Sequence, residues 1–82
     1  MSVDIRAWLA LHVGCCADDL RFAGADVRRA NSPTIHFTLD GQRGYVVQIT
    51  ERGFLGRRRH WDLTAAWPAG SATTTVSEKP GW

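Results

Sequence analysis

The sequence predicts a small α+β domain in which one N-terminal amphipathic helix packs on an antiparallel sheet of three or four strands. Three observations predict this fold. An apolar stripe with helical spacing occupies the first residues, two alternating segments flank an Asp-Gly turn within 34–50, and a third alternating segment follows at 57–63. With 82 residues the chain has room for one core, and its 44% hydrophobic and 22% charged residues are ordinary for a folded domain.

The N-terminal helix is expected to run from about Val3 to Val13. Ser2 can cap it, and Asp4 in the first turn is favourable at the positive end of the helix dipole. Gly14 is a suitable end because glycine adopts the left-handed conformation that closes many helices. The stripe that the sheet must cover consists of Ile5, Trp8, Leu9, His12, Val13 and Cys16.

The segment 15–31 allows two interpretations. Asp18 and Asp19 could cap a second short helix, or the segment could form a strand. A strand is favoured because 22–25 contains few strong helix formers and includes a glycine, which costs a helix about 1 kcal/mol relative to alanine. Pro33 then favours an extended backbone at the residue before it.

The clearest element is a β-hairpin over Thr34–Thr50. Asp40-Gly41 marks its reversal, because a tight hairpin turn needs positive φ, which glycine adopts freely and aspartate tolerates. Apolar residues alternate along both arms, at Ile35, Phe37, Leu39, Tyr45, Val47 and Ile49.

The third alternating segment carries three consecutive arginines. Every second residue of a strand shares a face. If Trp61 faces the core, Arg58 and His60 lie on the open face of the sheet, whereas Arg57 and Arg59 lie on the core side beyond the edge of the core.

After residue 66 the composition changes to Pro, Gly, Ser, Ala and Thr. The chain is therefore divided into one domain at 1–66 and a loose C-terminal tail at 67–82, in which 73–76 has the β-branched content to add an edge strand. An exposed sheet edge would also allow a homodimer.

Positive charge is concentrated in the middle of the chain. The net charge is +2, but the segment 28–59 holds seven arginines and two acidic residues. Arginine binds phosphate and carboxylate groups through its planar fork, so an anionic partner is expected. The arginine run with its adjoining aromatic residue suits a nucleic-acid backbone, although exposed arginines also keep edge strands soluble or bind acidic proteins.

Two further tryptophans, Trp67 and Trp82, lie among small residues and could anchor a protein interface or close the end of the sheet. The leading hypothesis is a non-enzymatic binding protein that contacts nucleic acid or a nucleoprotein. The alternative is a small inhibitor or adaptor, of the kind phage and mobile elements use against host systems, that docks on a larger protein complex. The candidate binding residues are Arg28, Arg29, Arg43, Arg52, Arg57, Arg58, Arg59, His60, Trp67 and Trp82.

No catalytic, metal or cofactor site is expected. Cys15 and Cys16 are adjacent and cannot form an ordinary disulfide, and with His12 they lack the second ligand pair of a structural zinc site. They are expected to be buried core thiols, and a Cys/His or metal enzyme is the less favoured alternative. The sequence shows no phosphate-binding loop, serine-hydrolase or zinc-protease motif. No apolar run is long enough to span a membrane, and a cytoplasmic location is expected.

Overall fold

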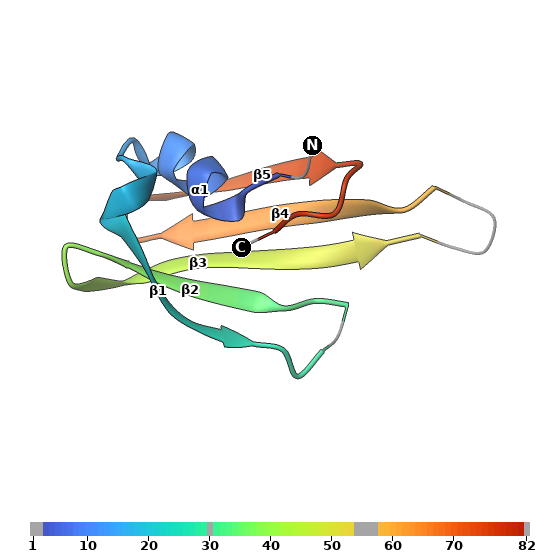
Figure 1. Cartoon of the computed structure of the whole chain (residues 1–82), viewed down its shortest axis with the longest axis horizontal. Coiled ribbons are helices and arrows are strands. Elements are labelled where there is room, and N and C mark those ends of the chain that lie inside the picture. Colours follow the sequence, from blue (N-terminus) through green and yellow to red (C-terminus); the bar gives the residue numbers. More distant parts are fainter. Residues whose placement is uncertain (1–2, 30, 54–57, 82) are drawn as a thin grey trace.

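The protein is an α+β domain with one antiparallel sheet of five strands in chain order (Figure 1). The computed structural model describes residues 3–29, 31–53 and 58–81. The expectation of three or four strands was too low, because both 20–26 and 70–76 pair with their neighbours. The elements are helix α1 (Ile5–Val13), the 3-10 turn η1 (Ala17–Asp19), and strands β1 (Leu20–Asp26), β2 (Thr34–Leu39), β3 (Gln42–Arg52), β4 (His60–Trp67) and β5 (Gly70–Val76).

Helix α1 begins two residues later than the sequence indicated, and Asp4 is its N-cap. The Asp4 side chain accepts hydrogen bonds from the backbone N–H groups of Arg6 (3.0 Å) and Ala7 (3.4 Å), which would otherwise lack partners. Gly14 ends the helix at φ 89°, as expected for a glycine C-cap. Ser2, the expected cap, lies outside the described residues.

The hairpin of β2 and β3 turns at Asp40-Gly41, as predicted. Both residues have positive φ, 52° for Asp40 and 78° for Gly41, and they are flanked by the pair Leu39–Gln42. Positive φ at both central positions gives the turn a twist that matches the strands. The register then shifts by one residue between Leu39 and Phe37, so a β-bulge beside the turn places the apolar residues of both arms on one face.

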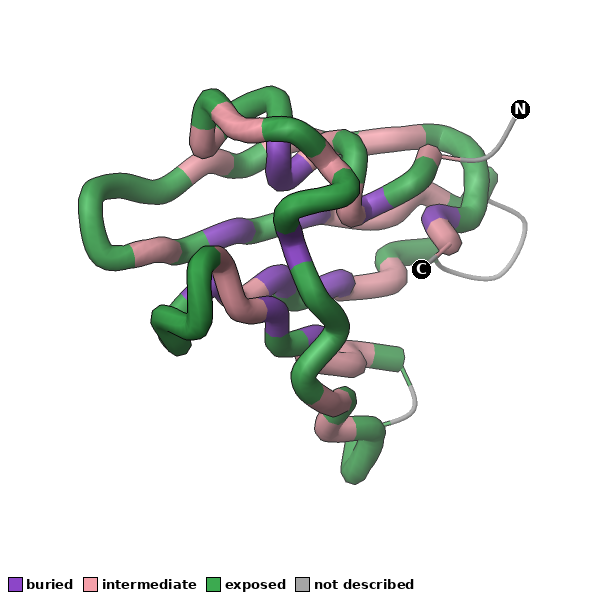
Figure 2. Tube along the Cα trace, turned by 60° about the vertical axis from the view of Figure 1, so that its left-hand side comes forward, coloured by how far each residue is buried: buried purple, intermediate pink, exposed green. Residues whose placement is uncertain are grey.

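The core lies between α1 and one face of the sheet (Figure 2). Ile5 and Leu9 of the helix are fully buried against it. His12 and Cys16, expected on the same stripe, are exposed. Cys15 is half-buried, so the expectation of buried core thiols was wrong for Cys16. The buried strand residues are Leu20, Ile35, Phe37, Tyr45, Val47, Ile49, Leu63 and Ala65.

The C-terminal segment is ordered as far as the structure describes it, and the expected loose tail contains β5. The chain then returns across the helix side, where the N–H of Gly81 donates to the carbonyl of Val3 (2.8 Å) and the N–H of Ile5 donates to the carbonyl of Gly81 (3.0 Å). Trp8 Nε1 also donates to Thr74 Oγ1 of β5 (3.1 Å). The bonds of Gly81 to Val3 and Ile5, and of Trp8 to Thr74, therefore hold α1 on the sheet.

The segment 15–31, for which the sequence allows a helix or a strand, forms η1 and then β1. The favoured strand is therefore present. The register of β1 against β2 shifts between Phe22 and Gly24, where Gly24 has φ 137°. A shift of this kind is a β-bulge, which bends the strand and strengthens its twist. Among the helices that the structure describes, none has the length and apolarity required to cross a membrane.

Candidate functional site

The face of the sheet opposite α1, here called the open face, is polar. Its side chains alternate with the core residues, and those of the described positions are exposed or half-buried. One row crosses all five strands in register and consists of Asp26, Thr34, Gln48, Thr64 and Thr73. Such a row offers hydroxyl, amide and carboxylate groups for hydrogen bonding to a ligand.

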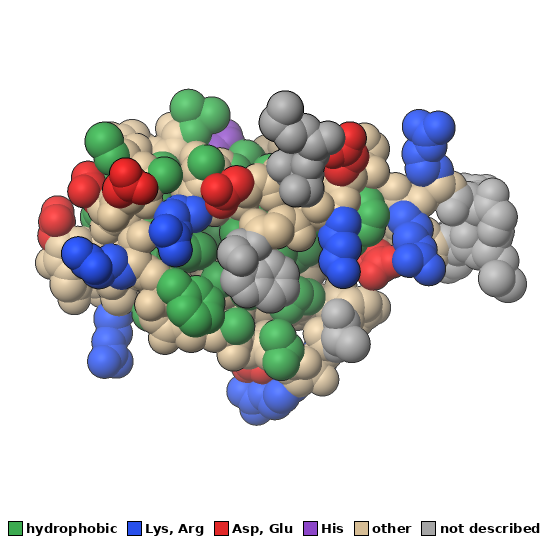
Figure 3. Space-filling view, in the orientation of Figure 1, with side chains coloured by type: hydrophobic (Ala, Val, Ile, Leu, Met, Phe, Trp, Pro, Cys, Tyr) green, Lys and Arg blue, Asp and Glu red, His purple; other side chains and the backbone are tan. Residues whose placement is uncertain are grey.

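Arginines gather at one end of this sheet, here called the basic end. Here β1 leads into β2 and β3 leads into β4, so residues far apart in the sequence become neighbours. Figure 3, which shows the helix side, has Lys and Arg side chains at the end where β3 meets β4, with an acidic side chain among them. The described arginines of the basic end are Arg28, Arg29, Arg52, Arg58 and Arg59.

Arg28 is held by Asp26. Its Nε donates to Asp26 Oδ1 (3.1 Å) and its Nη2 to Oδ2 (2.8 Å), while its backbone N–H donates to Oδ1 (3.1 Å). These bonds from Arg28, the side-chain bonds foremost, lower the pKa of Asp26 to about 2. The pair is exposed on the rim of the open face, with 89% of the Arg28 side chain accessible.

Arg52 and Asp62 form an ion pair across β3 and β4 on the open face. The contact joins Arg52 Nε to Asp62 Oδ2. Asp62 also accepts a hydrogen bond from Thr75 Oγ1 (2.8 Å), and this bond and then the Arg52 charge lower the pKa of Asp62. His60 is the cross-strand partner of Arg52 and lies beside it.

Arg59 lies on the helix side, as the alternation predicted. Its Nε contacts Glu51 Oε1 (3.4 Å), and Glu51 pairs with Trp61, whose ring packs against the core. In contrast, Arg29 and Arg58 form no ion pair with any residue in 3–29, 31–53 or 58–81. These two arginines are the cations of the basic end with most capacity for an added anion.

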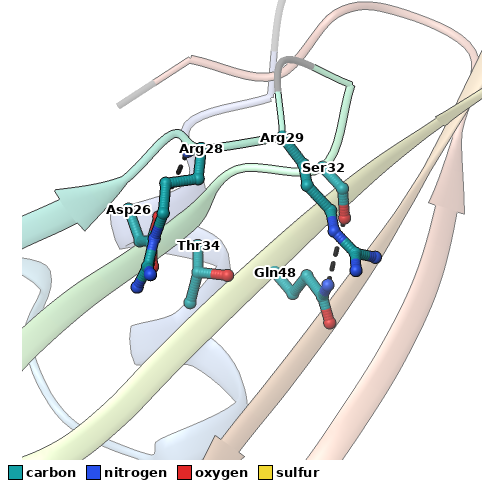
Figure 4. Close-up of a pocket in the computed structure, with 6 residues that line it drawn as sticks. All are labelled: Asp26, Arg28, Arg29, Ser32, Thr34 and Gln48. Carbon is teal, nitrogen blue, oxygen red and sulfur yellow. Dashed lines mark hydrogen bonds and ion pairs between the residues drawn. The ribbon is translucent and has the colours of Figure 1, made fainter.

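A hollow of about 360 Å³ lies on the open face beneath the β1–β2 loop (Figure 4). Arg28 and Asp26 line one side, and Arg29 extends over Gln48 on the other. Gln48 Nε2 donates to Ser32 Oγ (3.0 Å), which orients the amide and leaves its carbonyl oxygen facing outward as an acceptor. With Thr34 on its floor, the hollow combines cationic donors with neutral hydrogen-bonding groups.

Two of the predicted binding residues lie elsewhere. Arg43, at the start of β3, is nine residues from Arg52, or about 30 Å along the strand. It lines a separate hollow of about 370 Å³ that includes His36. Trp67 is at the same far end, half-buried and packed against the core. Arg57 and Trp82 lie outside the described residues.

The neutral side chains of the hollow were not among the predicted binding residues. Ser32, Thr34 and Gln48 carry no motif, and their only signal was their polar character at alternating positions of a strand or before it. Among the described residues, no group of three or more His, Cys, Asp or Glu side chains is placed to hold a metal ion. No protein-family model, curated protein or solved structure matches this chain.

Proposed function

We propose that this protein binds nucleic acid, alone or within a nucleoprotein, through the basic end of its open sheet face. One observation carries the proposal: two loops that are distant in sequence bring Arg28, Arg29, Arg52 and Arg58 to one end of an uncovered polar face. Arginine side chains neutralise phosphates, and that attraction supplies most of the affinity of sequence-independent binding.

The spacing of the cationic groups suits a strand of nucleic acid as the ligand. Arg29 lies over Gln48 of β3, and Arg52 follows Gln48 by four residues on the same face. The positions of Gln48 and Arg52 are therefore about 13 Å apart. Thr50 lies between them and hydrogen-bonds with Ser32 (3.4 Å). The hollow and the Arg52–His60 pair thus form a continuous polar track for a phosphodiester backbone.

The ion pairs limit how many phosphates can be neutralised. Asp26, Glu51 and Asp62 already balance three of the arginines, so Arg29 and Arg58 supply most of the uncompensated charge. The affinity should consequently be moderate and fall steeply with salt. The open face carries no Phe, Tyr or Trp side chain at its described positions, so we expect hydrogen bonding and charge, rather than stacking on large rings, to dominate.

The test is fluorescence anisotropy with a labelled single-stranded RNA and a DNA of the same sequence, at salt concentrations between about 50 and about 200 mM. We expect the logarithm of the binding constant to fall linearly with the logarithm of the salt concentration. The variant Arg29→Gln/Arg58→Gln should weaken binding and reduce the slope by about 1.4, because two phosphate contacts are lost.

The matched control is Arg21→Gln/Arg43→Gln, which removes the same charge from the opposite end of the sheet. It should change affinity much less than the first variant. Equal losses in both variants would mean that binding is not localised at the basic end. No binding of either nucleic acid at the lowest salt would refute the proposal.

A second candidate function is docking on a protein, as a small inhibitor or adaptor. Phe22 is 52% exposed and Val27 is 60% exposed, although Phe22 still makes an edge-to-face contact with Phe37 at a centroid distance of 6.4 Å. Exposed aromatic side chains are typical of protein interfaces. An affinity pull-down should then recover one stoichiometric protein with the wild type and lose it with Phe22→Ser. Recovery that is unchanged by this substitution would count against docking at Phe22.

A further inference from the structure

The sheet has two free edges, one on β1 and one on β5, because strand order follows chain order. A free edge presents unpaired backbone N–H and C=O groups, which pair with another strand unless the edge is protected. The two edges differ in how well they are protected.

The β1 edge is protected. Its register is broken between Phe22 and Gly24, and Gly24 has φ 137°. Charged side chains lie near both ends of the strand, at Arg21 and Asp26. Bulges and charges of this kind are how sheets prevent pairing at an edge.

The β5 edge has no such protection. Its sequence, Gly-Ser-Ala-Thr-Thr-Thr-Val, contains no charged residue and no proline, and it pairs with β4 from Gly70 to Val76 without a register shift. β-Branched residues favour the extended conformation along most of its second half. In 3–29, 31–53 and 58–81, the backbone hydrogen bonds outside helices and strands involve no residue of β5.

The geometry of the ladder identifies the free groups. The turn between β4 and β5 has two residues and is flanked by the pair Trp67–Gly70. The pair that closes such a turn is hydrogen-bonded, and bonded and non-bonded pairs alternate from there. The N–H and C=O groups of Ser71, Thr73 and Thr75 therefore point away from β4.

We propose that β5 pairs with β5 of a second copy of this chain, antiparallel and about a two-fold axis at Thr73, which makes one continuous sheet of ten strands. In this register Thr73 faces its own counterpart, Thr74 faces Ala72, and Thr75 faces Ser71. Every side chain keeps its face, because each pair joins two residues of the same face. The pairing forms about six backbone hydrogen bonds.

Two features favour a second copy over an unrelated peptide. A strand that pairs with itself must not place like charges opposite each other, and β5 has no charge. Leu11, 78% exposed, lies three residues after Trp8 and therefore shares with it the side of α1 that faces β5, where Trp8 bonds to Thr74. A large apolar side chain thus lies close to the unprotected edge, where a second subunit would cover it.

The experiment is light scattering coupled to size exclusion, over a range of protein concentrations. We expect the wild type to have twice the 9.1 kDa mass of the chain. Thr73→Lys should make it monomeric, because two lysines would meet at the axis. Thr73→Pro should do the same, because it removes an outward N–H that makes no bond to β4.

The matched control is Thr64→Lys. Thr64 is the cross-strand neighbour of Thr73 on the same exposed face, but it lies on β4, which is paired on both sides. This variant should remain dimeric. Circular dichroism of each variant tests whether the fold is retained, and a monomeric wild type at every concentration, or a dimeric and folded Thr73→Lys, would overturn the proposal.

A cross-linking measurement tests the register itself. In a Cys15→Ser/Cys16→Ser background, Thr73→Cys should form an intermolecular disulfide with oxidised glutathione as the oxidant, since directly opposed, bonded residues have Cα atoms about 5.5 Å apart. Thr64→Cys should not. A cross-link that is equally rapid in both variants would rule out this register. None of these measurements needs nucleic acid, so the dimer and the proposed function can fail separately.

Discussion

Arg52 on β3 and Asp62 on β4 form an ion pair on the open face, and Asp62 accepts a second bond from Thr75 Oγ1 on β5 (2.8 Å). Three adjacent strands are thereby linked at the basic end through one carboxylate. The negative charge of Asp62 also offsets the attraction between Arg52 and a phosphate. Asp62 therefore limits how strongly Arg52 can bind an anionic ligand.

Asp62→Asn should therefore strengthen nucleic-acid binding. The substitution removes the charge and keeps an acceptor for Thr75, so Arg52 gains freedom to contact a phosphate, and the salt slope should steepen by about 0.7. Anisotropy titrations against salt measure this change. Asp18→Asn, which alters the same charge in η1 far from the basic end, is the control, and weaker binding by Asp62→Asn would contradict the role given to Arg52.

The ion pair of Asp26 and Arg28 should make stability depend on pH. The pKa of Asp26 is about 2 in the fold, against an ordinary value of 3.8, so the pair stabilises the protein above pH 3.8 and that contribution is lost as the pH falls to about 2. The melting temperature of Asp26→Asn should fall below that of the wild type at neutral pH, and the gap should close near pH 2.

Carboxyl NMR measures the cause of that pH dependence directly. Arg28→Gln should move the titration midpoint of Asp26 up toward 3.8, because the side-chain bonds from Arg28 are its largest cause. Arg29→Gln removes the same charge one residue later without touching Asp26 and should leave the midpoint in place. An equal shift in both variants would indicate a general charge effect.

Leu63 is fully buried beneath α1, whereas its neighbour Thr64 is exposed on the open face. Leu63→Ala should lower the free energy of unfolding by about 2 to 5 kcal/mol, because it removes buried methyl groups and leaves a cavity. Thr64→Ala should change it by about 0.5 kcal/mol or less. Urea denaturation followed by tryptophan fluorescence gives both values, and similar losses would mean that the two faces are assigned incorrectly.

Gly41 has φ 78° in the β2–β3 turn, with open space where a Cβ would lie. Gly41→Ala should therefore destabilise the protein by about 1 to 2 kcal/mol through backbone strain alone. Gly81 also has open space but no positive φ, so Gly81→Ala should have little effect in the same denaturation measurement. A neutral Gly41→Ala would argue against the two-residue turn.

The local elements were predictable because each depends on residues close together in the sequence. The spacing of Ile5 and Leu9 predicts a helix face, and Asp40-Gly41 predicts the turn. The register of the two strands was not predictable, because it depends on a bulge between Phe37 and Leu39. The alternation around Trp61 also placed Arg59 on the helix side. Two features were predicted less well. Strand β5 consists of small and hydroxyl-bearing residues that resemble a loose tail, and the N-cap of α1 is Asp4 rather than the expected Ser2.

The sequence alone determined an α+β chain with a central hairpin and an excess of arginine between residues 28 and 59. The tertiary structure decided which arginines meet. Strand order brings Arg29 and Arg58 to one end and leaves Arg43 about 30 Å from Arg52, and it pairs Arg52 with Asp62. Local preferences act over a few residues, whereas the neighbours of a side chain on a sheet depend on strand pairings across the whole chain, so charge could be counted from the sequence but its arrangement required the fold.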